Sequence, residues 1–398
     1  MTVYRDLTDM SINEMVNGQE TGYTEEERSM EENRKVSMID YVQQTPAQIR
    51  CNVERSKELT HSLVEEYLKK EYRRILIIAC GSSYNGSLCS QRFVQKITGK
   101  ETKVLPPFSF VHFDHDVDKD DFIVVVSQSG RSTNAIEALN LLKEKGLRTI
   151  GITSDVNSDF KDICDLTIDW GVGVETVGYV TKGVVTLAAY FMLFAIEAQL
   201  SKGAITTEEA AGFKNEILKA MDAHEELQDS AQKYITAHEK ELYSIQEFYV
   251  ISAGSNLATA TEAALKISET VRIHATAYEC EEFLHGPVYP MTPRYSLMAY
   301  DTADENANQR IEAIYEAAKD LSLQPILVRC GVSDDPDVIS TSVALMDEVM
   351  PLAYLAVAPL LADFASHRLE IPRHPLLESF QKKVATKSLR YPKEFGQW

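Results

Sequence analysis

Residues 74–83 read RILIIACGSS, and residues 121–133 read DFIVVVSQSGRST. In both stretches a short, almost wholly apolar run ends abruptly in glycine and hydroxyl side chains. Such runs are typical of strands in parallel sheets, because helices cover both faces of those sheets. Residues 88–97 and 134–146 follow the two runs and show helical spacing of their apolar residues. The alternation of strand, polar turn and helix predicts βαβ units in a doubly wound sheet.

The second half of the sequence repeats this plan. After a third strand at 148–154, apolar runs recur at 247–254, 295–303 and 325–333, and residues 206–239 between the halves have high helix propensity. We therefore expect an α/β fold with two doubly wound, flavodoxin-like parallel-sheet subdomains in tandem. The expected boundaries are an N-terminal arm and helix at 1–49, a first domain at 50–215, a second domain at 216–370 and a C-terminal tail at 371–398 that contributes to the site.

Composition narrows the class of partner. The 398 residues include 60 acidic and 40 basic side chains, for a formal net charge of −20. Such a surface repels phosphate backbones and anionic lipids, so we expect no nucleic-acid or membrane partner. The six cysteines form no CxxC pair, the N-terminal residues are too acidic for an export signal, and the apolar run at 184–198 fits a buried helix. We expect a cytoplasmic protein.

The polar turns that follow the first two strands indicate an anion site. In an open parallel sheet, ligands bind beyond the carboxyl ends of the strands, where backbone amides at helix N-termini attract anions. Glycine and serine are also ordinary turn and cap residues, so one such loop alone would be a structural feature more often than a site. Two loops of the same composition favour a site, and neither matches GxxxxGKS or GxGxxG, which favours a small phosphorylated metabolite over a nucleotide. The candidate residues are Gly81, Ser82, Ser83, Ser127, Gln128, Ser129, Arg131 and Ser132.

A second group of residues could move protons. Lys266 and Glu269 stand three apart on an expected helix and therefore on one face, and His285 follows in a Leu-His-Gly-Pro turn. A carboxylate and an imidazole on either side of one substrate can transfer protons between adjacent carbons. The alternative is a solvated Lys–Glu salt bridge and a structural histidine. The acidic run at 279–282 has no second histidine at ligand spacing, so we expect neither a metal nor another cofactor.

Six segments, taken together and in this order, resemble the sugar isomerase (SIS, phosphosugar-binding) domain family. Within it the chain is similar to the isomerase half of glutamine–fructose-6-phosphate aminotransferase and to fructosamine-6-phosphate deglycases. The segments are ACGSSYN (79–85), VSQSGRST (126–133), VGYVTKG (177–183), EAALKISE (262–269), IHATAYECEEFLHGP (273–287) and FQKKVATKS (380–388).

The resemblance implies roles for the candidate residues. The serine loops would hold the sugar phosphate, and Glu269 would shuttle a proton between C1 and C2 with Lys266 beside it. His285 would open the sugar ring or act as the acid, reaching into the neighbouring subunit of a homodimer whose active site lies at the interface. The tail lysine that forms an imine with the ketose in the aminotransferase would be Lys382, with Lys383 as the alternative.

The sequence also departs from the aminotransferase. Arg131 replaces the usual acidic residue, Val180 replaces a serine, and Thr2 stands where the glutaminase half has its catalytic cysteine, so we expect no glutamine-dependent activity. The expected function is a deglycase that cleaves the C–N bond of a phosphorylated ketosamine to give a hexose 6-phosphate. The alternatives are an ammonia-dependent hexosamine-6-phosphate isomerase or deaminase, and a non-catalytic sugar-phosphate sensor. The identity of the amine and the pairing of dimers into tetramers stay open.

Overall fold

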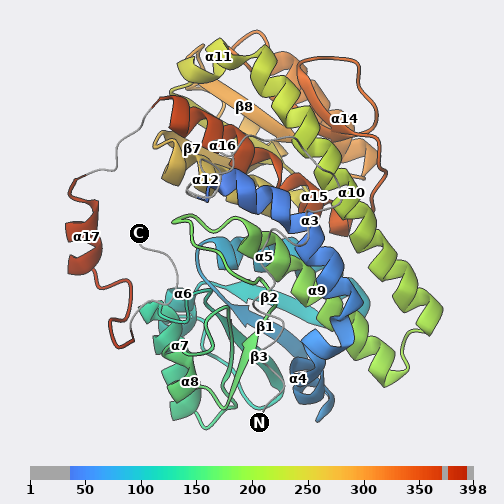
Figure 1. Cartoon of the computed structure of the whole chain (residues 1–398), viewed down its shortest axis with the longest axis vertical. Helices are drawn as coiled ribbons and strands as arrows, with labels where there is room; N and C mark the ends of the chain where they lie inside the picture. The colour runs from blue at the N-terminus through green and yellow to red at the C-terminus, as the bar shows by residue number, and fades with distance from the viewer. Residues whose placement is uncertain (1–35, 370–374, 392–398) are drawn as a thin grey trace, which may run out of the picture. The chain divides into compact units, whose positions relative to one another are not determined.

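Two five-stranded parallel sheets form the framework of the protein (Figure 1). The computed structural model describes residues 36–369 and 375–391, so most of the expected N-terminal arm lies outside the described residues. The first sheet has the order β2-β1-β3-β4-β5, and the second has the order β10-β9-β8-β6-β7. The strands are β1 (Arg74–Ile78), β2 (Glu101–Leu105), β3 (Asp121–Val126), β4 (Ile150–Thr153), β5 (Leu166–Asp169), β6 (Glu247–Ser252), β7 (His274–Glu279), β8 (Tyr295–Tyr300), β9 (Ile326–Cys330) and β10 (Val338–Thr341).

The two sheets have the same topology. Read in the reverse direction, the second sheet is β7-β6-β8-β9-β10, which corresponds strand by strand to the first. This order is the flavodoxin-like one, and it confirms the expected tandem doubly wound fold. The register also agrees, because the first residue of β1 pairs with the first residues of β2 and β3, and the first residue of β6 pairs likewise with β7 and β8.

Helices cover both faces of the first sheet. Along β1, Ile75 and Ile77 pack into one apolar cluster, whereas Leu76 and Ile78 pack into another on the opposite face. This double burial explains why the strand is apolar at nearly every position. The helices in the described residues are α3 (Met38–Glu54), α4 (Ser56–Leu68), α5 (Ser82–Thr98), α6 (Pro107–His112), α7 (Thr133–Glu144), α8 (Phe160–Ile163), α9 (Lys182–Lys202), α10 (Thr207–Ala237), α11 (Glu239–Ser244), α12 (Asn256–Thr270), α13 (Cys280–Leu284), α14 (Glu305–Ala318), η1 (Asp347–Val349), α15 (Met350–Tyr354), α16 (Val357–Arg368) and α17 (Leu377–Lys383).

Helix α9 is the central buried helix. Among the described helices it is long and apolar enough to cross a membrane by length and composition, but 94% of its most apolar window is buried inside the protein. It packs against α3, α4, α5 and α10. The expectation of a buried helix at 184–198 is thus confirmed, and the absence of a polar face on α9 follows from its neighbours on all sides.

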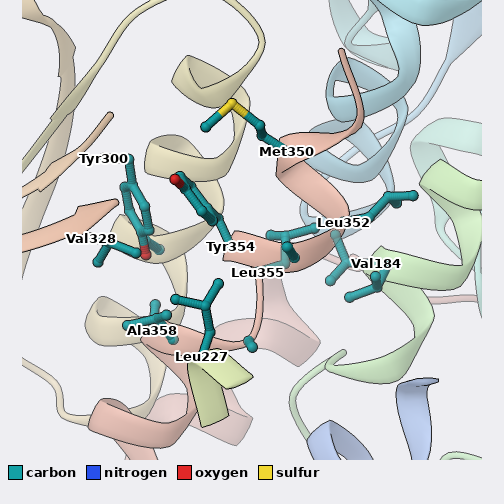
Figure 2. Close-up of a cluster of buried hydrophobic side chains, with 14 of the residues drawn as sticks. Val184, Leu227, Tyr300, Val328, Met350, Leu352, Tyr354, Leu355 and Ala358 are labelled. Carbon is teal, nitrogen blue, oxygen red and sulfur yellow. The ribbon is translucent and has the colours of Figure 1, made fainter. Parts of the chain in front are cut away.

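One continuous apolar cluster joins the two halves. Figure 2 shows Val184 of α9 beside Leu352 of α15, and Tyr300 of β8 beside Tyr354 of α15; with Leu227 of α10 they belong to the same cluster. Helix α10 begins with a capping box between Thr206 and Glu209 and packs along both halves (Figure 1). Because α10 runs through position 215 without a break, the two sheets are held as one body from Met38 onward.

Candidate active site

A pocket of about 330 Å³ opens beyond the carboxyl ends of β1 and β3. This volume lies within the range of small-molecule sites. Its wall is completed by the loop before α9, by α12 from the second half and by one residue of the C-terminal tail. The lining residues are Cys80, Gly81, Ser82, Ser83, Ser127, Gln128, Ser129, Arg131, Ser132, Ser154, Asp155, Glu175, Val177, Gly178, Val180, Leu265, Glu269 and Lys387. All eight residues proposed from the sequence as the anion site therefore lie together.

The two serine loops present donors at helix N-termini. Gly81 is the N-cap of α5 with φ of 60°, and Ser132 is the N-cap of α7. The Oγ atoms of Ser127 and Ser132 lie 3.1 Å apart. Between them Gly130 has φ of 60°, and a Cβ there would stand 1.8 Å from the Oγ of Ser158, so this turn requires glycine. Hydroxyls and helix-terminal amides in this arrangement suit an anionic group.

Arg131 lies at the edge of these loops and is paired. Its guanidinium lies 3.0 Å from Asp155 Oδ2, and both side chains are nearly buried. An arginine at this position could add a cation beside a phosphate or face a substrate carboxylate. The ion pair shows that the carboxylate of Asp155 balances the charge of Arg131. The pair therefore contributes hydrogen-bonding groups and a defined surface to the pocket wall, but little net charge.

Lys266 and Glu269 form an ion pair on α12, in agreement with the prediction from their spacing that they share one helix face. Lys266 is fully buried, and its Nζ lies 2.6 Å from Glu269 Oε1, 3.1 Å from Glu262 Oε1 and 2.6 Å from the carbonyl oxygen of Val180. Glu269 is half-buried, with its carboxylate in the pocket wall. The solvated salt bridge considered as an alternative is therefore not what the structure contains, because the lysine has no access to water.

The electrostatic environment of this pair suits Glu269 to act as a general base. Burial raises the pKa of Glu269 above the usual carboxyl range, and the charge of Lys266 partly opposes this rise. Although burial disfavours the ammonium form, the two carboxylates Glu262 and Glu269 raise the pKa of Lys266, so it stays charged. A carboxylate with a raised pKa beside a fixed cation in a pocket is suited to accept a proton from a substrate.

Glu262 joins the two halves behind this couple. Its carboxylate accepts hydrogen bonds from Ser82 Oγ at 2.9 Å and Asn85 Nδ2 at 2.8 Å, both at the start of α5. Glu262 is buried, and it also contacts Lys266. The anion loop of the first half is thus connected to Glu269 of the second half through one carboxylate. The sequence reasoning missed Glu262, although its spacing of four residues from Lys266 on one helix is a signal that could have revealed it.

Glu175 is a second carboxylate that the sequence reasoning missed. It accepts from the backbone amides of Thr181, Lys182 and Gly183 at 2.7, 2.8 and 3.1 Å, and from Gln128 Nε2 at 2.7 Å. It therefore occupies the N-terminus of α9, where a negative charge is stabilised. Glu175 fixes the loop whose Val180 carbonyl receives Lys266. No local motif marks this role, because it depends on how the loop folds back.

The C-terminal tail brings a lysine into the pocket, and that lysine is Lys387. Its Nζ donates to Ser132 Oγ at 2.9 Å and lies 3.4 Å from Ser129 Oγ. Lys382, in contrast, lies on the exposed helix α17 and pairs with Glu378 at 2.7 Å, and neither it nor Lys383 lines this pocket. The structure therefore corrects the sequence-based assignment of the tail lysine. The helical phase of α17 turns Lys382 toward Glu378, whereas the extended segment after α17 reaches the serine loop.

Hydrogen bonds fasten this extended segment over the loop after β3. Thr133 donates from its amide to Thr386 O at 3.3 Å, and Ser388 donates from its amide to Arg131 O at 2.8 Å. The Oγ of Ser388 also donates to Asp159 at 2.7 Å. Burial lowers the pKa of Lys387 below the usual lysine value, with the nearby Arg131 charge acting in the same direction. An amine of this kind is more readily deprotonated than a surface lysine.

His285 lies outside this pocket. It follows α13 as the C-cap residue, is exposed, and does not line the pocket of its own chain. Helix α13 is nevertheless well fixed, since Glu279 caps it by accepting from the amides of Glu281 and Glu282 at 2.8 and 3.0 Å. Within one chain, then, the structure brings Glu269 and the serine loops together but leaves His285 at the surface.

The sequence and the fold are similar to those of known proteins. Residues 68–196 match the SIS domain family. Glutamine–fructose-6-phosphate aminotransferase (isomerizing) of Gloeobacter violaceus is 26% identical over 283 residues, which are 71% of this chain and 45% of that enzyme. The chain spans about half the length of the curated relatives that it matches.

Two solved structures share the architecture. A candidate phosphosugar isomerase of Clostridium difficile 630 superimposes with a TM-score of 0.80 at 22% identity, covering 89% of this chain and 100% of that one. The C-terminal domain of glucosamine-fructose-6-phosphate aminotransferase from Francisella tularensis gives a TM-score of 0.72 at 20% identity, covering 85% and 97%. Residues 68–196 are thus similar to the SIS domain family, and the chain has the tandem fold of these solved structures, as its sequence motifs predicted.

Proposed function

We propose that this SIS-domain protein is a cytoplasmic phosphosugar enzyme that cleaves the C–N bond of a phosphorylated ketosamine of the fructosamine 6-phosphate type. The observation that carries the proposal is the buried Lys266–Glu269 couple facing two serine-rich helix N-termini across one pocket. A sensor needs only the anion loops, whereas a carboxylate with a raised pKa opposite them is the additional feature that proton transfer requires.

The phosphate would bind at the loops after β1 and β3. Backbone amides at the starts of α5 and α7 and the hydroxyls of Ser83, Ser127 and Ser132 supply neutral donors there, and Lys387 supplies a cation. This local arrangement overcomes the overall charge of −20. With the phosphate in this position, the sugar carbons extend toward Glu269.

The reaction follows from a base placed at C1. The Glu269 carboxylate takes a proton from C1 of the ketosamine, and the C2 carbonyl receives the electron pair, which gives an enaminol. Return of a proton to C2 gives an imine at C1; water adds to that carbon and the amine leaves. The products are a hexose 6-phosphate and a free amine or amino acid, and one water is consumed. The substrate's own carbonyl is the electron sink, so the scheme needs no cofactor.

His285 would act across a dimer interface. It is exposed and lies outside the pocket of its own chain, which fits the implied role of an acid or ring-opening group supplied by a partner subunit. Mixed dimers test this: Glu269→Gln and His285→Ala chains, each inactive alone, should regain activity when they are mixed and re-equilibrated, because one composite site per hybrid is intact. Hybrids shown by mass to have formed, but without recovered activity, would place each site within one chain.

The proposed substrate class is tested by hexose 6-phosphate release from a panel of 6-phosphofructosyl and 6-phosphoglucosyl amino acids and from glucosamine 6-phosphate. We expect glucose 6-phosphate from an amino-acid conjugate, and loss of at least 100-fold in kcat for Glu269→Gln with the Kd for the sugar phosphate little changed. Glu208→Gln, on the exposed first turn of α10, is the matched control. Binding without turnover across the panel would instead support the sensor.

One observation favours the second candidate, an imine-forming hexosamine-6-phosphate isomerase or deaminase. The amine of Lys387 has a lowered pKa and lies in the pocket, as an imine-forming lysine requires. Borohydride added with fructose 6-phosphate would then reduce an imine and attach the sugar to the lysine, which is detected by peptide mass. A sugar adduct on Lys387, together with activity on glucosamine 6-phosphate alone, would establish this candidate in place of the deglycase.

A further inference from the structure

The second half of the chain contains a copy of the anion loop. Because β1 and β6 have the same register in their sheets, Gly254 and Ser255 correspond to Gly81 and Ser82. The backbone agrees, since Gly254 has φ of 59° and Gly81 has φ of 60°. By the same register, Ala303 after β8 corresponds to Ser129 after β3. The second half thus keeps the backbone shape that attracts an anion beyond its strand ends.

A carboxylate of the chain itself fills this second loop. Asp347, in η1, accepts from Ser255 Oγ at 2.7 Å and from the Ser255 amide at 3.3 Å through Oδ2, and its Oδ1 lies 3.4 Å from the amide of Ala303. Donors after both β6 and β8 therefore converge on one anion. In the described part of the chain no lysine, arginine or histidine pairs with Asp347, so the Ser255 donors at the start of α12 and the Ala303 amide provide its stabilisation.

Two further features hold this arrangement in place. The residues after Asp347 are anchored, because Val349 and Met350 are buried in the cluster that joins the two halves. Figure 2 shows Met350 in this cluster. In addition, Asp301 occupies the position that corresponds to Ser127, so a carboxyl group replaces a hydroxyl next to the loop. The second loop therefore lacks the hydroxyl that Ser127 presents in the first.

We propose that Asp347 is a built-in substitute for the phosphate in a latent second anion site, and that each chain consequently binds one sugar phosphate and not two. The prediction that one sugar phosphate binds per chain rests on the proposed function, whereas the latent anion site is independent of it. A groove of about 870 Å³ lined by Gly254 and Ser255 gives small solutes access to the loop.

Removal of the carboxylate should make this site responsive to added anions. Asp347→Ala deletes a group of the size of formate, so the variant should have a lower unfolding temperature that formate or inorganic phosphate restores by at least about half, by mass action. Sodium chloride at equal ionic strength should not restore it. Phosphate is also expected to bind the first site and to stabilise both proteins through it. The increase in unfolding temperature caused by phosphate is therefore measured in both the variant and the unchanged chain, and the increase in the unchanged chain should be smaller. Glu208→Ala, on the exposed first turn of α10, is the control and should show no added response.

The outcomes separate this proposal from the proposed function. An Asp347→Ala chain as stable as the unchanged one, or equally responsive to formate, would overturn the latent site. Should Asp347→Ala fail to fold unaided, its refolding yield should rise with added formate and not with sodium chloride. Calorimetric titration with glucose 6-phosphate should give one site per unchanged chain; two sites would contradict the proposal, and no binding at all, with anion rescue intact, would contradict only the proposed function.

Discussion

The Nζ of Lys387 lies 2.9 Å from the Oγ of Ser132, a residue 255 positions earlier in the sequence. This contact joins the C-terminal tail to the loop after β3 and places a cation beside the hydroxyls of the pocket. The tail is therefore part of the site wall, held by its own backbone hydrogen bonds to Arg131 and Thr133.

Replacing this lysine should weaken phosphosugar binding. Lys387→Met should raise the Kd for hexose 6-phosphate by roughly 10- to 100-fold, because a hydrogen bond to a charged group is worth about 1.5–3 kcal/mol. Lys382→Met provides the matched control within the same tail and should bind normally, since Lys382 pairs with Glu378 on an exposed helix. Isothermal titration measures both, and the reverse ranking of the two variants would restore Lys382 as the site lysine.

The charge of Lys266 should set the pH dependence of turnover. Burial raises the pKa of Glu269, and Lys266 opposes the rise. The acid limb of kcat/KM should therefore lie above the ordinary carboxyl pKa of about 4.3. In Lys266→Met this opposition is lost, so the limb should move to still higher pH, whereas Lys266→Arg should keep it near its original position. A limb that stays in place in Lys266→Met would show that Glu269 is not the titrating base.

Glu175 should contribute to both stability and binding. Glu175→Ala leaves three amides at the start of α9 and the side chain of Gln128 without their acceptor. We expect a loss of about 1–2 kcal/mol in the free energy of unfolding, as for a lost N-cap, together with weaker sugar-phosphate binding. Urea unfolding measures the first effect. Glu208→Ala, on an exposed helix start, should change neither, and equal losses in the two variants would remove the special role of Glu175.

Asp301 should make stability depend on pH. Burial raises the pKa of Asp301 to about 7, while its side chain accepts hydrogen bonds from Tyr354 and from the amide of Cys330. A carboxyl group whose pKa is higher in the folded state stabilises the fold most below its unfolded pKa of about 3.9. This contribution, on the order of 4 kcal/mol, is lost as the pH rises from about 4 to about 7.

Substitution isolates that contribution. Asp301→Asn should flatten this part of the stability profile, because the amide stays neutral and can still accept from the Cys330 amide. Urea unfolding at several pH values should show the difference between the variant and the unchanged chain growing between pH 4 and 7. Parallel profiles over that range would mean that Asp301 does not titrate there.

Whether a strand could be predicted from the sequence depends on its position in the sheet. The inner strands β1, β3, β4, β6, β8 and β9 all correspond to predicted runs, because burial on both faces makes them continuously apolar. The edge strands β2, β5, β7 and β10 were not predicted. In β2 the residues alternate between exposed and buried, and β7 has no fully buried residue, so neither carries the pattern of an inner strand.

Some residues of the candidate site could likewise be predicted from the sequence, and others could not. Residues at strand ends, such as Ser83 and Ser127, could be predicted because parallel topology brings the ends of β1 and β3 together. The Lys266–Glu269 couple could be predicted from helical spacing. Lys387 and Glu175 could not, because their positions depend on the path of a tail and of a loop, and local periodicity contains no information about either path.

Solvent deuterium incorporation tests the central claim, that Glu269 transfers a proton from C1 to C2, most directly. The enzyme is run on a 6-phosphofructosyl amino acid in D₂O, and the released glucose 6-phosphate is examined by NMR and mass spectrometry. The account predicts that single-turnover product keeps protium from C1 at C2 in part of the molecules, with deuterium in the rest where the Glu269 carboxyl exchanges with solvent first, and that Glu269→Gln shows neither release nor exchange. Complete deuterium labelling at C2 in single-turnover product, or release or exchange that persists in Glu269→Gln within tenfold of the unchanged rate, would contradict it.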